Sequence, residues 1–297
     1  MTVTFSVQPL RGVRILSLAL NLPGPAALLR CAAMGAQCTK LEPPPPLGQP
    51  TADPMGHYSP VAYAALHDGV GVLHAHLKTS EGQAVLHAAL ANADVLLTSF
   101  RPSALDKLGL GWEALHARYP QLSLVRIVGA TGQRAEEPGH DLTYQAEAGL
   151  LQGLQMPPTL LADMAGSLAA SEAVLQAQLA CAQDGQGVCL DVGLAESAQW
   201  MALPATWGLM HADSDTGGAH AGYQMYPCAD GRVAMAALEP HFAARLCEAA
   251  GLPPQGDAAT LRTASTHAAI AQFVAPQTRA QLQVLAHDKD IPLYTLP

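Results

Sequence analysis

The sequence predicts an α/β fold with a mainly parallel sheet, followed by a smaller α+β domain. Short apolar segments alternate with segments of helical spacing along the first two thirds of the chain, which is typical of βαβ units. The pattern changes at Gly217 and Gly218, after which a hairpin precedes two helices. We therefore expect a large domain over residues 1–216 and a small domain over residues 217–297, and a chain of 297 residues is long enough for both.

The first elements follow from apolar runs and the residues that interrupt them. Val13–Leu20 is a short apolar run that predicts a strand, Asn21–Pro25 predicts a turn, and Ala26–Met34 has helical spacing. A second strand is predicted at Cys38–Leu41 and ends before Pro43–Pro46, because consecutive prolines exclude helix and ladder pairing. We expect a loop from there to Pro60.

The same alternation continues to the end of the large domain. The predicted elements in chain order are a helix at Ser80–Leu90, strands at Asp94–Leu97 and Leu122–Val128, helices at Leu142–Leu151 and Asp163–Ala182, and a strand at Val188–Val192. The small domain is predicted to contain a hairpin that turns at Asp230-Gly231 and continues through Val233–Leu238, then helices at Pro240–Ala250 and Thr260–Phe273.

Composition excludes several classes of function. Fifteen basic against 24 acidic residues give a net charge of −9, and no basic run is present to bind nucleic acid. The most apolar stretch, Val13–Ala36, is interrupted by charged and proline residues, so no membrane span is predicted. Met1–Arg11 lacks the pattern of a secretory signal, and the six cysteines form no C-x-x-C pair, so we expect a cytoplasmic protein.

Three places combine ionisable side chains with a helix start or a turn. His140 precedes a predicted helix and is suited to general base chemistry, although the sequence alone favours a simpler explanation, with Asp141 as a helix cap and His140 as a loop residue. Asp163 lies between an apolar run and a helix, where capping competes with a raised pKa and proton transfer. Glu239 ends a predicted strand before Pro240 and is, in isolation, most simply a surface residue.

Other candidate motifs carry less weight. His74 and His76 would share one strand face, but no further ligand at metal-site spacing accompanies them, so no metal is predicted. No G-x-G-x-x-G or Walker loop follows a strand, and no G-x-S-x-G elbow is present. Nucleotide hydrolysis and serine hydrolysis therefore lose support.

Taken together, the motifs resemble the family III CoA transferases, the carnitine-dehydratase-like group, over nearly the whole chain. The resemblance rests on the order and spacing of Arg11-Gly12-Val13, Pro23-Gly24-Pro25, Lys40–Pro44, Ala93–Leu97, Phe100-Arg101-Pro102, Leu108–Gly111, Gly139-His140-Asp141, Asp163–Gly166, Gly185-Gln186-Gly187 with Asp191, and Glu239-Pro240. It implies a Rossmann-like large domain that binds CoA.

The resemblance also implies roles for the three sites. The family's transferases use a carboxylate corresponding to Asp163 as the acylated nucleophile, whereas its racemases pair that carboxylate with a histidine and carry a Glu-Pro pair in the small domain. Because His140 and Glu239-Pro240 are present, we expect racemisation of a 2-methylacyl-CoA, with His140 and Asp163 as the two bases and Glu239 orienting His140. Backbone N–H groups from Asp163 to Gly166 would stabilise the enolate oxygen. No metal or redox cofactor is required, since CoA is part of the substrate.

CoA carries phosphates, so the resemblance also implies cationic contacts. Arg101 is the best candidate, followed by Lys107, Arg126 and Arg134, although each is equally explained as a surface charge. The family's basic segment is replaced here by His67–Lys78, which predicts weaker CoA binding or a different ligand.

The resemblance further implies a homodimer, or an assembly with a full-length paralogue. The family's return from the small to the large domain would begin at Ile291–Pro297, where this sequence stops, so interlocking of the subunits is left open. A transferase with Asp163 as its nucleophile and a non-catalytic partner subunit remain alternatives.

Overall fold

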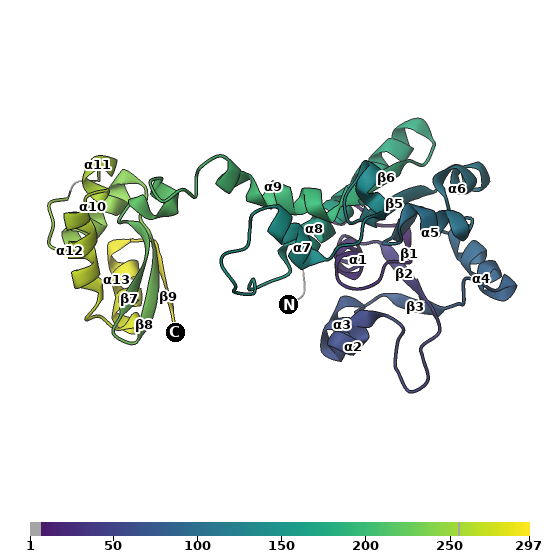
Figure 1. Cartoon of the computed structure of the whole chain (residues 1–297), viewed down its shortest axis with the longest axis horizontal. Helices are drawn as coiled ribbons and strands as arrows, with labels where there is room; N and C mark the ends of the chain where they lie inside the picture. The colour runs from purple at the N-terminus through teal and green to yellow at the C-terminus, as the bar shows by residue number, and fades with distance from the viewer. Residues whose placement is uncertain (1–6, 255) are drawn as a thin grey trace. The chain divides into compact units, whose positions relative to one another are not determined.

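The computed structural model describes residues 7–254 and 256–297, so Met1–Ser6 of the N-terminal segment lie outside the described residues. The chain divides into two compact units, Met1–Ala202 and Leu203–Pro297 (Figure 1). The division falls inside α9 (Leu194–Thr206), whereas the change of sequence pattern led us to expect a boundary between residues 216 and 217.

The first unit is built on a six-stranded sheet whose neighbouring strands are all parallel, as predicted. Its spatial order is β3-β2-β1-β4-β5-β6, so the order along the chain reverses between β1 and β4. The strands are β1 (Arg14–Ser17), β2 (Gln37–Glu42), β3 (Gly71–His74), β4 (Val95–Thr98), β5 (Ser123–Val128) and β6 (Cys189–Gly193).

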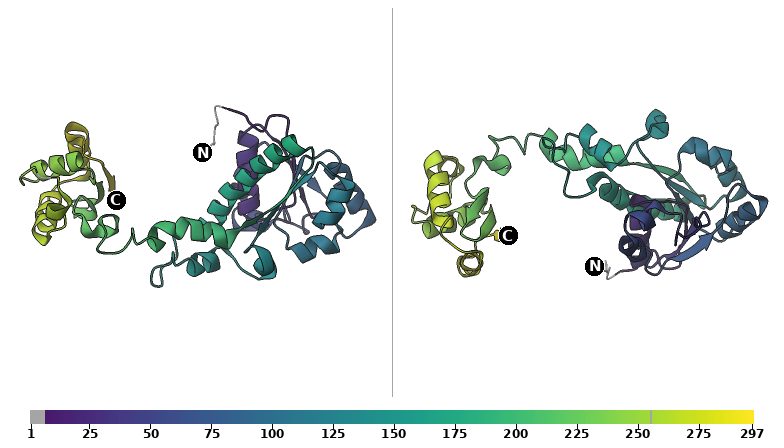
Figure 2. Two further views of the ribbon diagram at one scale, coloured as in Figure 1. Left: turned by 90° about the horizontal axis from the view of Figure 1, so that it is seen from above. Right: turned by 60° about the horizontal axis from the view of Figure 1, so that its bottom comes forward.

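Helices cover both faces of this sheet (Figure 2). The apolar residues of each strand alternate between two cores: Ile15 packs with α1 and α8 on one face, and Leu16 packs with α4, α5 and α6 on the other. The helical segments of this unit are α1 (Pro23–Ala33), α2 (Pro54–Tyr58), α3 (Pro60–Leu66), α4 (Ser80–Leu90), α5 (Pro102–Lys107), α6 (Trp112–Arg118), the 3₁₀ segment η1 (Gly132–Glu136), α7 (Asp141–Glu147), α8 (Leu161–Asp184) and the first part of α9.

The second unit packs helices against a three-stranded antiparallel sheet of order β7-β8-β9. Its core contains Val233 and Met235 from β8 and Leu246 from α10. The elements are η2 (Asp215–Ala219), β7 (Tyr223–Cys228), β8 (Gly231–Ala236), α10 (Pro240–Ala249), α11 (Ala258–Leu261), α12 (Ala264–Val274), α13 (Arg279–Lys289) and β9 (Leu293–Leu296).

Three local predictions were wrong. The expected loop up to Pro60 contains α2, and α3 follows it; both are capped, by Asp53 and Ser59. The helix after His140 ends at Glu147, because Gly149 adopts a left-handed φ of 73° and turns the chain. The single helix expected over Thr260–Phe273 is α11 and α12, since Thr263 caps a new helix. Ile291–Pro297, where the family's return segment would begin, contains β9, which pairs with β8.

No helix among the described residues combines the length and apolar character required to cross a membrane.

Candidate functional site

A pocket of about 200 Å³ lies in the first unit, at the carboxyl ends of the parallel strands. The loops after β1, β4 and β5 line it, and the order of the strands reverses between β1 and β4, the position at which open α/β sheets bind ligands. Its polar lining residues include Asn21, Ser99, Arg101, His140, Tyr144 and Asp163. Two of the three residues predicted to be catalytic, His140 and Asp163, therefore share one pocket.

Asp163 lies in the first turn of α8. Burial among apolar neighbours, and to a smaller extent the charge of Asp141, raise the pKa of its carboxyl group to about 7. A carboxyl group with this pKa exists in both protonation states near neutral pH, so it can accept or donate a proton there.

Asp141 connects the two helices that carry the site. Its Oδ1 accepts a hydrogen bond of 3.0 Å from the backbone N–H of Asp163, and its Oδ2 accepts one of 2.6 Å from Gln145 Nε2. Gln145 Nε2 also donates to the carbonyl of Thr159 at 3.1 Å. The buried Asp141 thus fixes the start of α8 against α7.

His140 is the exposed residue that precedes α7. Its backbone N–H donates to Thr143 Oγ1 at 3.1 Å, and Thr143 Oγ1 donates back to the His140 carbonyl at 2.7 Å. The backbone of His140 is therefore fixed by Thr143 at the point where His140 lines the pocket.

Tyr144 lies in α7, after His140 in the sequence, and forms part of the wall of the pocket. A Cβ atom on Gly139 would lie 2.5 Å from the Tyr144 hydroxyl oxygen, and one on Gly129 would lie 2.4 Å away, so both positions need glycine. Burial raises the pKa of Tyr144, and the nearby charge of Asp163 adds to the effect. The tyrosine therefore stays neutral beside the acid.

The four predicted cationic contacts lie in different surroundings. Arg101 lines the pocket, and within residues 7–254 and 256–297 neither it nor Lys107 forms an ion pair. Arg126 pairs with Asp191 at 2.6 Å between β5 and β6. Arg134 pairs with Glu137 at 2.9 Å and with Glu147 at 2.7 Å. Of the four, Arg101 is the cation that both faces the pocket and keeps its charge free for a ligand.

Glu239 is exposed and directly precedes α10 in the second unit. Its predicted role toward His140 stays a prediction.

Two of the backbone N–H groups predicted as donors at the start of α8 have partners within the chain. The Asp163 N–H donates to Asp141, and the Met164 N–H donates to the Leu160 carbonyl at 3.0 Å. Gly166 is buried, and a Cβ atom there would lie 2.2 Å from Leu194 Cδ2. The close packing of Leu194 explains this small residue, and the role of this backbone toward an enolate oxygen stays a prediction.

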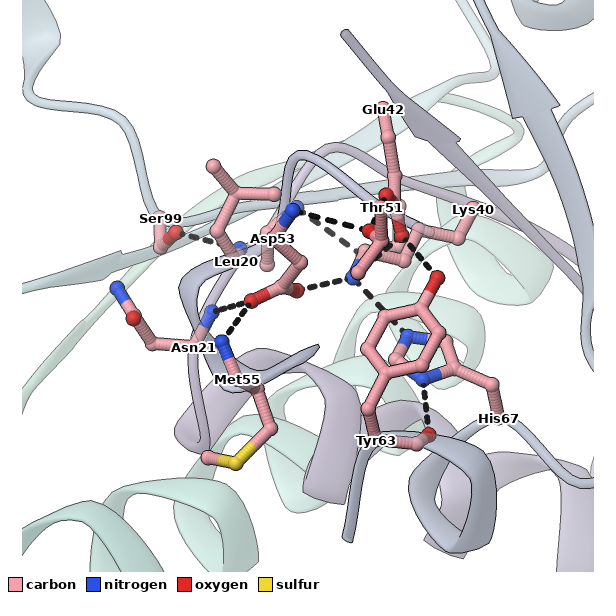
Figure 3. A network of polar contacts seen from close by, with 12 residues as sticks. Leu20, Asn21, Lys40, Glu42, Thr51, Asp53, Met55, Tyr63, His67 and Ser99 are labelled. Atoms are coloured by element: carbon pink, nitrogen blue, oxygen red, sulfur yellow. Dashed lines mark hydrogen bonds and ion pairs between the residues drawn. The ribbon is translucent and has the colours of Figure 1, made fainter. Parts of the chain in front are cut away.

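A buried polar cluster lies beside the pocket, around Lys40 (Figure 3). The Lys40 ammonium donates to Asp53 Oδ2, lies 3.1 Å from Glu42 Oε1 and lies 3.0 Å from His67 Nε2. His67 Nδ1 lies 2.6 Å from the Tyr63 carbonyl, which only accepts, so Nδ1 carries the proton and Nε2 accepts from Lys40. Glu42, Asp53 and His67 have the spacing of a metal site, but the ammonium lies at all three acceptors and supplies the compensating charge.

Three residues of this region were not singled out from the sequence as functional: Asn21, Tyr144 and Asp141, which was interpreted only as a cap. For Asn21 the sequence offered one signal, its position just before Pro23-Gly24-Pro25. The structure gives this residue a left-handed φ of 64°. The link from Asp141 to Asp163 joins residues 22 positions apart, and nothing local in the sequence indicates it.

Comparison with known proteins gives a consistent result. The profile of CoA-transferase family III matches residues 10–296. The chain is 31% identical to the succinyl-CoA–D-citramalate CoA-transferase of Chloroflexus aurantiacus, over 96% of this chain and 77% of the relative. It is also 31% identical to the alpha-methylacyl-CoA racemase of Mus musculus, over 82% of this chain. The match spans 65% of that racemase, which is less than two thirds of its length.

Solved structures agree on the fold. The crystal structure of Rv3272 from Mycobacterium tuberculosis matches with a TM-score of 0.81 and 25% identity, over 98% of this chain and 83% of that one. A CAIB/BAIF family protein from Brucella suis matches with a TM-score of 0.79 and 24% identity, over 98% and 85% of the two chains. Racemases and transferases are both among the relatives, so similarity alone does not choose between the two reactions.

Proposed function

We propose that this chain, which belongs to CoA-transferase family III, binds an acyl-CoA thioester and inverts the carbon next to the thioester carbonyl of a 2-methylacyl-CoA. The observation that carries the proposal is that His140 and Asp163 line one pocket at the carboxyl ends of the sheet. Inversion needs one group to remove a proton from one face of the carbon and another to deliver a proton to the opposite face.

The pKa of Asp163 supports this chemistry. In one direction the Asp163 carboxylate takes the proton, the C–H electron pair moves onto the thioester oxygen as an enolate, and protonated His140 returns a proton to the other face. In the other direction the two groups exchange roles. With a pKa of about 7, the Asp163 carboxyl group is present near neutral pH both as the base that takes a proton and as the acid that returns one, so either direction can use it.

CoA would be held as part of the substrate, with Arg101 as the phosphate contact because it lines the pocket without an ion pair among the described residues. Lys107 is exposed at the end of α5 and is a further candidate. Arg126 and Arg134 would have to leave their carboxylate partners to contribute.

Deuterium exchange tests the proposal. The protein is incubated with a 2-methylacyl-CoA in D₂O, and deuterium at the α carbon is followed by NMR. We expect exchange by wild type and a loss of about 100-fold or more in His140→Ala and Asp163→Asn. His74→Ala, an exposed histidine on β3, is the matched control and should exchange at the wild-type rate.

The outcome against racemisation is no exchange by wild type, or exchange by His140→Ala at the wild-type rate. Glu239→Gln belongs to the same series: if Glu239 orients His140, as the family resemblance implies, exchange slows in this variant as well.

The second candidate function is CoA transfer with Asp163 as nucleophile, favoured by the transferase at 31% identity. This reaction predicts an acyl or CoA adduct on Asp163 that is trapped from an acyl-CoA, found by mass spectrometry and lost on treatment with hydroxylamine. It also predicts little dependence on His140. A non-catalytic partner subunit, the third possibility, predicts no CoA binding by calorimetry and co-purification with a longer paralogue.

We also propose that the chain forms a homodimer in the cytoplasm. An open groove of about 590 Å³ between α8, β6 and α9 of the first unit carries the exposed side chains Leu168, Trp200 and Met201. Exposed apolar side chains grouped along a groove favour association. The six cysteines form no C-x-x-C pair in the sequence, and a chain of this size needs no disulfides for stability, which favours a reducing compartment.

A further inference from the structure

The loop between β1 and α1 is held in an unusual conformation at the edge of the pocket. Asn21 has a left-handed φ of 64°, a conformation that asparagine tolerates better than most residues. Its backbone N–H donates to Asp53 Oδ1 at 3.0 Å, and the N–H of Leu20 donates to Ser99 Oγ at 3.1 Å. Two successive residues of the loop are therefore anchored to other segments of the chain.

The side chain of Asn21 is free for a ligand. It lines the pocket together with His140 and Asp163. In Figure 3 its amide points away from the Asp53 carboxylate, and among the described residues it makes no side-chain hydrogen bond. A carboxamide both donates and accepts hydrogen bonds, so it matches another amide better than it matches a phosphate.

The buried ammonium group of Lys40 in turn holds Asp53. The three N–H donors of the Lys40 ammonium match three acceptors, on Asp53, Glu42 and His67, and Lys40 has no exposed surface. Asp53 Oδ1 also accepts from the N–H of Met55 at 2.9 Å. With both carboxylate oxygens engaged, Asp53 holds the Asn21 backbone in one position.

We propose that the Asn21 carboxamide hydrogen-bonds an amide of the CoA arm, and that Asp53, fixed by Lys40, is the positioning residue that holds it there. The inference rests on the proposed function, because it takes a CoA thioester as the ligand. It assigns a binding role to Asn21 and a positioning role to Asp53.

Calorimetric titration tests the binding role with two probes, acetyl-CoA and adenosine 3′,5′-bisphosphate, the second of which lacks the amide-bearing arm. In Asn21→Gly, glycine accepts the left-handed backbone and only the carboxamide is lost. We expect its affinity for acetyl-CoA to fall about tenfold, with affinity for the bisphosphate within twofold of wild type. An acetyl-CoA affinity within twofold of wild type, or an equal loss for both probes, would overturn the assignment.

A double-mutant cycle tests the positioning role. Because Asp53 acts through Asn21, Asp53→Ala should weaken acetyl-CoA binding about as much as Asn21→Gly, and the double variant should lose no more than either single one. Additive losses would overturn it. Tyr63→Phe is the control: it removes the 2.7 Å hydrogen bond to Glu42 in the same cluster without touching Asp53, and should lower the Tm while leaving the affinity unchanged.

Two outcomes separate this inference from the proposed function. If wild type binds acetyl-CoA but exchanges no α proton, racemisation fails and the Asn21 assignment is still decided by its own titrations. If wild type does not bind acetyl-CoA, both fail. Should Asp53→Ala not fold, Asn21→Gly alone decides the binding role, and Asp53→Asn takes its place in the cycle, because its single acceptor oxygen cannot serve both the Asn21 N–H and the Lys40 ammonium.

Discussion

The raised pKa of Asp163 lowers the free energy of unfolding of the protein at neutral pH. Its pKa in the folded protein is about 7, whereas the ordinary value is 3.8. Above pH 4 the unfolded chain carries an ionised carboxylate in water, and the folded chain must either hold the proton or ionise the group in an apolar site. The penalty therefore grows between about pH 4 and pH 7 and is constant above pH 7.

Replacing this carboxyl group should stabilise the protein in a pH-dependent way. Asp163→Asn removes the ionisation, so we expect its free energy of unfolding to exceed that of wild type by about 1–3 kcal/mol at pH 8 and to match it near pH 4. Urea denaturation at these two values measures the difference. A gain of equal size at both pH values would contradict the raised pKa.

Asp94 provides a control of opposite sign. The Arg14 guanidinium and backbone N–H, which donate hydrogen bonds to its carboxylate, hold the pKa of Asp94 below its ordinary value even though burial opposes them. Its stabilising contribution is present above pH 4 and is lost as the pH falls through the folded pKa. Asp94→Asn should therefore destabilise the protein at pH 8.

The charge of Asp141 should be measurable through Asp163. Asp141→Asn removes a like charge while leaving an oxygen to accept the Asp163 N–H, so we expect the pKa of Asp163 to fall from about 7. Carboxyl-carbon NMR titration of Asp163 measures this. An unchanged pKa would mean that burial alone sets it.

At the level of single residues, local sequence left two explanations of Asp163 open, helix capping and a pKa raised by burial. The structure gives the raised pKa. Asn21 and Asp53, 32 positions apart, interact only because the chain returns to the carboxyl end of β1, and no local pattern encodes that contact.

At the scale of elements, the buried strands were the most predictable. β4 is buried at every position, so its sequence is a continuous apolar run that predicts a strand within a parallel sheet. α2 and α3 were missed because the proline run that precedes them suggested a loop, although Asp53 and Ser59 are ordinary caps and Pro54 and Pro60 suit a first helical turn.

Gly185 and Gly187, at the end of α8, are glycine for two different reasons. Gly185 has a left-handed φ of 71° with open space around its Cβ position, so Gly185→Ala should cost only backbone strain, about 1 kcal/mol. A Cβ atom on Gly187 would lie 2.1 Å from the Leu122 carbonyl oxygen, so Gly187→Ala must displace the entry to β6 and should cost about 3 kcal/mol. Thermal denaturation of the two variants checks the order, and equal losses would contradict it.

At the scale of the whole molecule, the sequence predicted the α/β fold and the family, because motifs spread along the chain keep their order. The sequence did not decide between racemisation and CoA transfer. Racemisation and transfer both place chemistry on Asp163, so the residue they share cannot distinguish them. The difference depends on what His140 does, which is a question of proton transfer and not of fold.

The groove between α8, β6 and α9 is the surface on which we expect a second copy of the chain to bind. Trp200 has 72% of its surface exposed and Leu168 has 48%, and both line the groove between α8, β6 and α9. Covering these side chains with a second copy would remove apolar surface from water, at about 25 cal/mol per Å². Since one chain has a mass of 30.9 kDa, light scattering should give about 62 kDa for wild type.

Trp200→Glu places a charge in the centre of this groove and should shift the mass toward that of a single chain. Val61→Glu is the matched control, because Val61 is 80% exposed on α3 and lies outside the groove, so this variant should keep the mass of a dimer. A wild-type mass of about 31 kDa would contradict the dimer. If instead the wild type is dimeric and Trp200→Glu remains so, the dimer forms through another surface, and the exposed side chains of the groove then need a different partner.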